Sequence, residues 1–133
     1  HAQVAALCFR MTPAGREVLL ITSRDTGRWI IPKGWPIRGL GSAEAAVQEA
    51  WEEAGVQDAH ADTRAIGSYS YDKTMDSGLP LPIETLVYSV EVGQLADDFP
   101  ERSERRRKWV SPQEAALLVD EPELKTILQE LDS

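Results

Sequence analysis

At 133 residues, with 42% hydrophobic and 27% charged side chains, the chain predicts one folded domain over residues 1–133 and is too short for two. Its net charge of −8 argues against general nucleic-acid binding, which requires a basic surface. The single cysteine, Cys8, cannot form an internal disulfide, and no apolar run approaches the ~18 residues that span a membrane, so we expect a cytoplasmic protein without a membrane partner.

The start of the chain predicts a strand hairpin and a short extended segment. Residues 3–11 and 17–23 are apolar runs of strand-like composition, and the Pro and Gly within residues 12–16 predict the turn between them. Residues 29–32 should be extended, because their final proline disfavours helix in the residue before it.

A loop rich in Gly and Pro follows, and then a helix begins. Ser42 has the side chain of an N-cap residue, and Glu44 falls in the first turn, where the helix dipole favours an acid. The helical spacing continues to about Ala54. Gly55 is the residue type expected just past a helix end.

Three carboxylates share one face of this predicted helix. Residues three and four apart point the same way, so Glu49, Glu52 and Glu53 project together. Their like charges repel by roughly 0.2–0.5 kcal/mol per pair, and a divalent cation is the simplest way to offset that repulsion. A solvated face is the alternative, and the flanking Gly34 and Gly55 favour the metal-binding interpretation.

The second half of the chain alternates strands with loops and ends in helices. This order predicts the α/β class, with a mixed β-sheet flanked by helices. Strands are expected over residues 61–75, 83–92 and 109–110, and helices over residues 112–118 and 122–131.

A basic run contrasts with the acidic remainder. Residues 102–108, RSERRRK, hold five basic residues and one acid, a net charge of +4. Strand alternation would place Arg106 and Lys108 on one side and Arg105 and Arg107 on the other, so they cannot all bind one ligand. The run is therefore either a phosphate clamp or a soluble edge.

The tryptophans and the histidines favour structural interpretations. Trp29, Trp51 and Trp109 are expected in the core rather than as stacking platforms, and the role of Trp35 stays open because it lies in the loop. The chain has only two histidines, which gives no support to histidine-based catalysis or a zinc site.

The segment GWPIRGLGSAEAAVQEAWEEAGV resembles the signature of the Nudix hydrolases, G-x5-E-x7-R-E-U-x-E-E-x-G-U, in which U is apolar. The matching positions are Gly34, Glu49, Glu52, Glu53, Gly55 and Val56.

Two positions depart from this signature. Leu40 stands where the pattern has Glu and Gln48 where it has Arg, a pair that in the family helps to hold the loop and helix in place. Both replacements are neutral, so neither leaves an unpaired charge. The flanking segments LLITSRDTGRWIIPKGW and RRRKWVSPQEA resemble the diphosphoinositol polyphosphate and diadenosine polyphosphate hydrolase branch.

The resemblance implies an α/β/α sandwich and a Mg²⁺-dependent hydrolase, with Mn²⁺ as a possible substitute. Its substrate would be a small, highly charged molecule with a phosphoanhydride bond, such as a diphosphoinositol polyphosphate or a dinucleoside polyphosphate. The metal ligands would be Glu49, Glu52, Glu53 and the carbonyl of Gly34, and loss of Glu52 or Glu53 should be the most damaging.

The other site residues that the resemblance implies are less specific. The general base would be Glu53 or a distal carboxylate, with candidates Glu84, Glu101 and Glu104. Phosphate groups would bind the cations Arg24, Arg28, Lys33, Arg106 and Lys108. A Nudix-fold binding or regulatory module with weakened catalysis is the alternative function, and Leu40 and Gln48 are the residues that suggest it.

Overall fold

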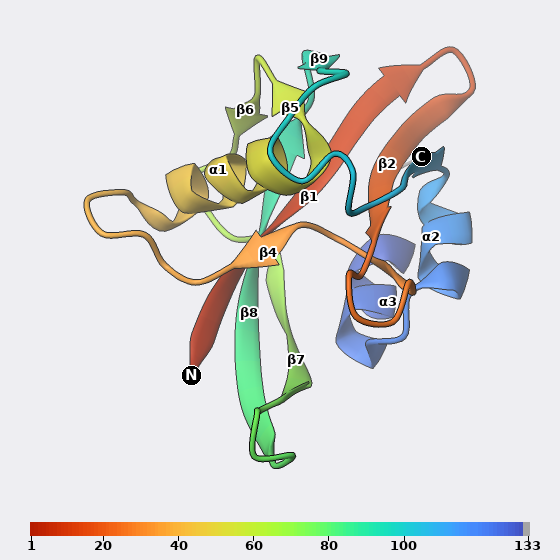
Figure 1. Ribbon diagram of the computed structural model, residues 1–133. Coiled ribbons are helices and arrows are strands. Elements are labelled where there is room, and N and C mark those ends of the chain that lie inside the picture. The colour runs from red at the N-terminus through yellow and green to blue at the C-terminus, as the bar shows by residue number, and fades with distance from the viewer. Residues whose placement is uncertain (132–133) are drawn as a thin grey trace.

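The computed structural model describes residues 1–131, so residues 132 and 133 of the predicted domain lie outside the described part. Within that part, three helices flank a mixed sheet of eight strands, with α1 (Ser42–Ala54) on one side and α2 (Pro112–Leu118) and α3 (Pro122–Gln129) on the other (Figure 1). A separate two-stranded pair is formed by β5 (Val56–Gln57) and β9 (Gln94–Leu95). The strands of the large sheet are β1 (Ala2–Thr12), β2 (Gly15–Thr22), β3 (Trp29–Ile30), β4 (Lys33–Gly34), β6 (His60–Ala61), β7 (Gly67–Thr74), β8 (Pro80–Glu91) and β10 (Arg107–Val110).

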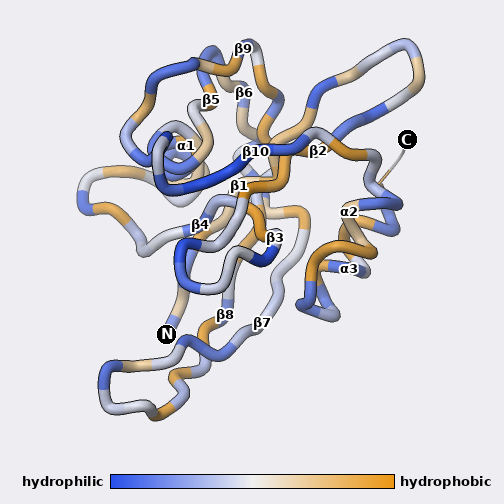
Figure 2. The backbone as a smooth tube through the Cα atoms, turned by 45° about the vertical axis from the view of Figure 1, so that its right-hand side comes forward, coloured by the Kyte–Doolittle hydropathy of each residue, from blue (hydrophilic) through white to orange (hydrophobic). Residues whose placement is uncertain are grey.

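Alternation along the central strands divides the core into two layers. Val4, Ala6 and Cys8 of β1 pack on the α1 side, whereas Ala5 and Leu7 pack on the α2 and α3 side. The tube in Figure 2 shows these hydrophobic stretches running between the helices. Fully burying one aliphatic side chain of this kind contributes roughly 1.5–3 kcal/mol. The predicted α/β/α sandwich is therefore confirmed.

β1 organises the sheet because it pairs with three other strands. It runs antiparallel to β2, which confirms the predicted hairpin, and parallel to β8. It also pairs with β4, where Val4 lies opposite Gly34. This last pairing fixes the backbone of Gly34 next to the start of β1.

The two ends of α1 are defined by glycines. The N-cap is Gly41 rather than the predicted Ser42, and its N–H donates to Oε1 of Glu44 at 3.0 Å. Gly55 ends the helix as predicted, with a φ of 72°. A Cβ at Gly55 would lie 2.6 Å from Cδ1 of Phe99, so both the left-handed backbone and the packing require glycine here.

The prediction of one long strand over residues 61–75 is wrong. The structure has β6 and β7 instead, separated by residues 62–66, and both strands pair with β8. Oδ1 of Asp62 accepts a hydrogen bond from the backbone N–H of Arg64 at 3.2 Å, which stabilises a turn between the two strands. The hairpin of β7 and β8 then projects from the body of the molecule (Figure 1).

The C-terminal helices follow the sequence pattern closely. Oγ of Ser111 accepts a hydrogen bond from Glu114 N at 3.1 Å, as expected for the N-cap of α2. α3 ends before the predicted Leu131, but Leu124 and Leu128 form its expected buried face.

The three tryptophans predicted in the core lie at its edge, and Trp29 and Trp109 pack against it. Trp29, Trp51 and Trp109 are half-buried, and Trp35 is 42% exposed. Cys8 is a buried core residue. Among residues 1–131, no helix has the length and apolar character needed to cross a membrane.

Candidate active site

A cavity of about 280 Å³ lies beside the C-terminal half of α1. Its wall is built by segments far apart in sequence: β1, the loop after β2, β3, β4, α1, β7 and the loop before β10. The charged residues that line it are Arg24, Asp25, Lys33, Glu49, Glu53, Lys73, Glu101 and Arg105.

Glu49 packs against the backbone of Gly34. A Cβ at Gly34 would lie 2.6 Å from Oε2 of Glu49, so the carboxylate occupies the space that any larger residue would need. That Oε2 is buried and has no hydrogen-bond partner among the described residues. A buried carboxylate oxygen without a donor is unfavourable unless a cation lies beside it. The oxygen therefore suits a metal ion.

Glu53 is held from two sides. Its Oε1 accepts a hydrogen bond from Lys33 N at 3.3 Å and lies 3.7 Å from Nη2 of Arg105. The side chain of Arg105 is buried. Its Nε donates to Oε1 of Glu101 at 2.8 Å, and its Nη1 donates to the carbonyl of Thr22 at 3.0 Å. Arg105 thus links the helix carboxylate to the loop before β10.

Glu52 lies outside the cavity lining. Its Oε2 accepts a hydrogen bond from Nε2 of Gln48 at 3.2 Å on the exposed side of α1. Successive helical residues are about 100° apart, so a helix that turns Glu53 inward turns Glu52 toward solvent. Within residues 1–131, no three His, Cys, Asp or Glu side chains are grouped closely enough to hold a metal ion. The structure brings Glu49 and Glu53 together in the cavity and leaves the half-buried Glu52 outside its lining, near enough for its charge to act on Glu49.

Burial makes the two cavity carboxylates weak acids. It raises the pKa of Glu49 from 4.5 to about 7, reinforced by the charges of Glu52 and Glu101. It also raises the pKa of Glu53 to about 7, against the opposing charge of Arg105. Near neutral pH a cation entering the cavity would therefore displace protons from these groups.

Three of the predicted phosphate-binding cations lie near the cavity. Arg24 and Lys33 line it, although Nη1 of Arg24 is also 3.3 Å from Oε1 of Glu104. Arg28 lines an adjoining cavity of about 510 Å³. Nη1 of Arg28 donates to Oε2 of the buried Glu121 at 2.8 Å, so its charge is already neutralised.

The basic run alternates as the sequence predicts, but its phosphate-clamp interpretation gains no support. Cζ of Arg106 and Nζ of Lys108 lie 5.7 and 5.9 Å from the ring centroid of Trp29. Neither residue lines the cavity. Arg105 and Arg107 face α1 instead. Nη1 of Arg107 donates at 3.0 Å to the last carbonyl of α1, where a cation complements the helix dipole.

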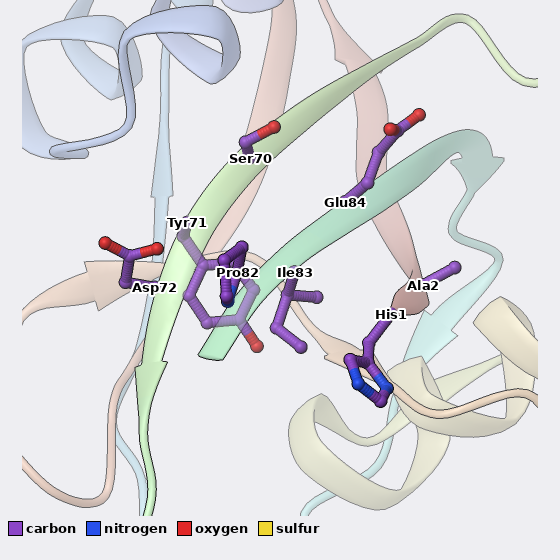
Figure 3. Close-up of a pocket in the computed structure, with 8 residues that line it drawn as sticks. All are labelled: His1, Ala2, Ser70, Tyr71, Asp72, Pro82, Ile83 and Glu84. Atoms are coloured by element: carbon purple, nitrogen blue, oxygen red, sulfur yellow. The ribbon is translucent and has the colours of Figure 1, made fainter. Parts of the chain in front are cut away.

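Of the distal carboxylates, Glu101 lines the cavity and the other two candidates do not. Glu84 lies in a larger cavity of about 770 Å³, beside the N-terminus and the hairpin of β7 and β8. Figure 3 shows its carboxylate directed away from that of Asp72, the acid across the same cavity. Glu104 is exposed and pairs with Arg24. The larger cavity therefore does not bring its two carboxylates together.

Arg105 is the functional residue that the sequence left without a role. One signal was present, because Glu101 and Arg105 have the i,i+4 spacing of an ion pair within one helical turn. Residues 101–104 do form a turn. The contact with Glu53 depends on tertiary packing and had no local signal.

The comparisons with known proteins identify the family. The model described as NUDIX domain matches residues 1–131, and the chain therefore belongs to the Nudix family.

One curated relative and one solved structure are similar over most of this chain. Human diphosphoinositol polyphosphate phosphohydrolase 3-beta is 30% identical over 115 residues, which cover 85% of this chain and 65% of that protein, so the chain spans about two thirds of its relative's length. The C. elegans Ap4A hydrolase binary complex has a TM-score of 0.69 at 20% identity, covering 96% of this chain and 92% of that one. These names agree with the branch that the flanking segments resemble.

A further solved structure shares the fold. The NUDIX domain of Shewanella oneidensis NrtR, complexed with ADP ribose, has a TM-score of 0.68 at 18% identity and covers 97% of this chain and 86% of that one. At such identities the likeness concerns the fold alone.

Proposed function

We propose that the chain is a cytoplasmic, divalent-metal-dependent hydrolase that cleaves a phosphoanhydride bond in a small, highly charged substrate. The observation that carries this is the pair of carboxylates beside Gly34: Glu53 is buried, and Glu49 is half-buried with a buried Oε2 that lacks a partner among the described residues. Clustered carboxylate and carbonyl oxygens are the ligands that Mg²⁺ prefers, and Mn²⁺ accepts the same set. Membership of the Nudix family supports the same chemistry.

Glu49, Glu53 and the carbonyl of Gly34 are the groups that would hold the ion. Glu52 would join them once its carboxylate leaves the amide of Gln48, an exposed hydrogen bond that contributes about 1 kcal/mol. A divalent ion supplies an activated water and neutralises charge that develops on the phosphate oxygens.

Glu101 is the residue that we assign to accept the proton of the attacking water. Its Oε1 is fixed by Nε of Arg105 at 2.8 Å and lies 3.8 Å from Nη1 of Arg24, which orients the carboxylate and leaves Oε2 for the proton. Arg24 and Lys33 line the same cavity. Arg24 is already paired with Glu101 and Glu104, so Lys33 is the cation that adds positive charge for the phosphate groups.

Turnover with Mg²⁺ or Mn²⁺ tests the proposal on diadenosine tetraphosphate, ADP-ribose and a diphosphoinositol pentakisphosphate. The parent chain should hydrolyse one or more of these, and Glu53→Gln should lower the rate about a hundredfold or more. Glu101→Gln should lower it far more than Glu84→Gln, because only the former lines the cavity. An inactive parent, or a Glu53→Gln variant at the parent rate, would contradict the proposal.

A binding or regulatory module is the second candidate. Leu40 and Gln48, the two departures from the signature, line an apolar groove of about 470 Å³ along α1, and Gln48 also holds Glu52. Binding of ADP-ribose in the presence of Mg²⁺ without any product would favour this function over hydrolysis.

A further inference from the structure

We propose that the site takes a short phosphate chain that carries an aromatic ring, with the ring on Trp35 and the phosphates on Lys33, and that it disfavours a densely phosphorylated inositol ring. This rests on the proposed hydrolase function and narrows its substrate class. It separates this chain from what the names of its diphosphoinositol relatives suggest.

The charge of the cavity is the first argument. Four basic and four acidic side chains line it, so the protein alone gives it no excess of positive charge. Arg24 and Arg105 are already in ion pairs with Glu101. Among the described residues, the ammonium groups of Lys33 and Lys73 have no ion pair. Two such cations and a metal ion suit a short phosphate chain.

The adjoining cavity does not add the missing charge. It shares Lys33 and Lys73 with the first cavity, and its further cation, Arg28, is bound to Glu121 at 2.8 Å. Asp25 lines both cavities. A ring with phosphates around its whole circumference would therefore meet acids and neutralised arginines on several sides, and like charges that are not offset disfavour binding.

Lys33 is positioned to contact the phosphate chain. It lines both cavities, and its Nζ lies 5.0 Å from the ring centroid of Tyr71, so the ammonium group has an aromatic face where a paired acid would otherwise be. Its own backbone N–H holds Glu53 at 3.3 Å, which ties the position of this lysine to the catalytic helix.

Trp35 is positioned to contact the ring. Trp35 lines the cavity and is 42% exposed, although a large aromatic residue normally gains from burial. Its backbone is held in place, since Gly34 pairs with Val4 in the sheet and Pro36 restricts the residue before it. An exposed indole with a fixed backbone is a platform on which a planar ring can stack.

Binding of a non-hydrolysable probe tests this inference without relying on turnover. With Mg²⁺ present, α,β-methylene-ADP should bind the parent at least about tenfold tighter than inositol hexakisphosphate in calorimetric titrations. Trp35→Ala should weaken the nucleotide analogue about tenfold, whereas Trp35→Phe keeps a stacking face and should stay within about threefold of the parent.

Lys33→Met tests the phosphate contact against a charge-matched control. It should weaken the nucleotide analogue about tenfold. Arg64→Met removes the same charge from an exposed turn outside both cavities, and it should leave the affinity unchanged. Thermal melts of each variant show that any loss of binding comes from a folded protein.

The outcomes separate this inference from the hydrolase proposal. Tighter binding of inositol hexakisphosphate, or parent-like binding by Trp35→Ala, would overturn the inference while leaving hydrolysis possible. Failure of turnover on every substrate would remove the hydrolase assignment, and the order of affinities would still decide which ligand class the site accepts.

Discussion

Replacing Gly34 by Ala should separate metal binding from folding. The φ of Gly34 is outside the left-handed region, so alanine fits the backbone there. Its Cβ, however, would lie 2.6 Å from Oε2 of Glu49, well inside van der Waals contact. The atoms in the way belong to the end of a flexible side chain, so we expect Glu49 to swing out of the cavity while the sheet stays intact.

The expected magnitudes follow from this geometry. Alanine restricts the unfolded chain, which stabilises a compatible site by about 0.4–1 kcal/mol, so metal-free stability should change by no more than about 4 °C in Tm. Mg²⁺ at a hundredfold excess over its Kd should stabilise the parent by about 2.7 kcal/mol, a shift of about 10 °C. Gly34→Ala should lose most of this shift.

Thermal melts with and without Mg²⁺, together with turnover, measure both effects. Gly55→Ala is the informative counterpart, because a φ of 72° and the ring of Phe99 oppose a side chain there. It should lower metal-free stability by about 1–2 kcal/mol and keep the Mg²⁺ shift. If Gly34→Ala binds Mn²⁺ with parent affinity, or turns over within about threefold of the parent, the packing of Glu49 on Gly34 does not define the metal site.

The remaining predictions concern charge. Metal-free stability should fall as pH rises from about 4.5 to about 7, because Glu49 and Glu53, with pKa values raised to about 7, keep protons that the unfolded chain has lost. Glu53→Gln should flatten this pH dependence in urea unfolding, and an unchanged slope would contradict the prediction. Arg28→Met should lower the free energy of unfolding by about 3 kcal/mol in the same assay, because it leaves Glu121 buried and unpaired. A decrease below about 1 kcal/mol would contradict a stabilising role for this ion pair. Arg105→Lys should lower kcat at least about tenfold, because lysine cannot contact both carboxylates and the Thr22 carbonyl as Arg105 does. Arg106→Lys, outside these contacts, should have no such effect, and equal losses in the two variants would contradict the positioning role of Arg105.

The local parts of the fold could be predicted because their signals are local. The hairpin, α1 and the two C-terminal helices are specified by alternating or helical spacing and by caps such as Ser111 and Gly55. The strand over residues 61–75 failed because a turn by Asp62 interrupts an otherwise strand-like composition. A side-chain hydrogen bond lies within this break, and composition carries little information about such a bond.

Helical spacing could predict which carboxylates share a face of α1, but not which of them faces the cavity. Periodicity placed Glu49, Glu52 and Glu53 on one side, but it could not say which member of a 100° arc would face inward. Tertiary packing made that choice by burying Glu53 under Arg105. The selection of Glu101 over Glu84 likewise depends on the loop before β10, whose position no short-range pattern encodes.

The arrangement of the basic residues explains how an acidic chain could act on an anionic substrate. Arg105 holds two carboxylates of the site, and Arg107 caps α1, so these cations position the protein's own groups. The positive charge for the phosphates must then come largely from Lys33, Lys73 and a divalent ion. Because binding free energies are reciprocal, a substrate that depends on the ion must also tighten the binding of the ion. Ion and substrate should therefore enter this cavity as a cooperative pair.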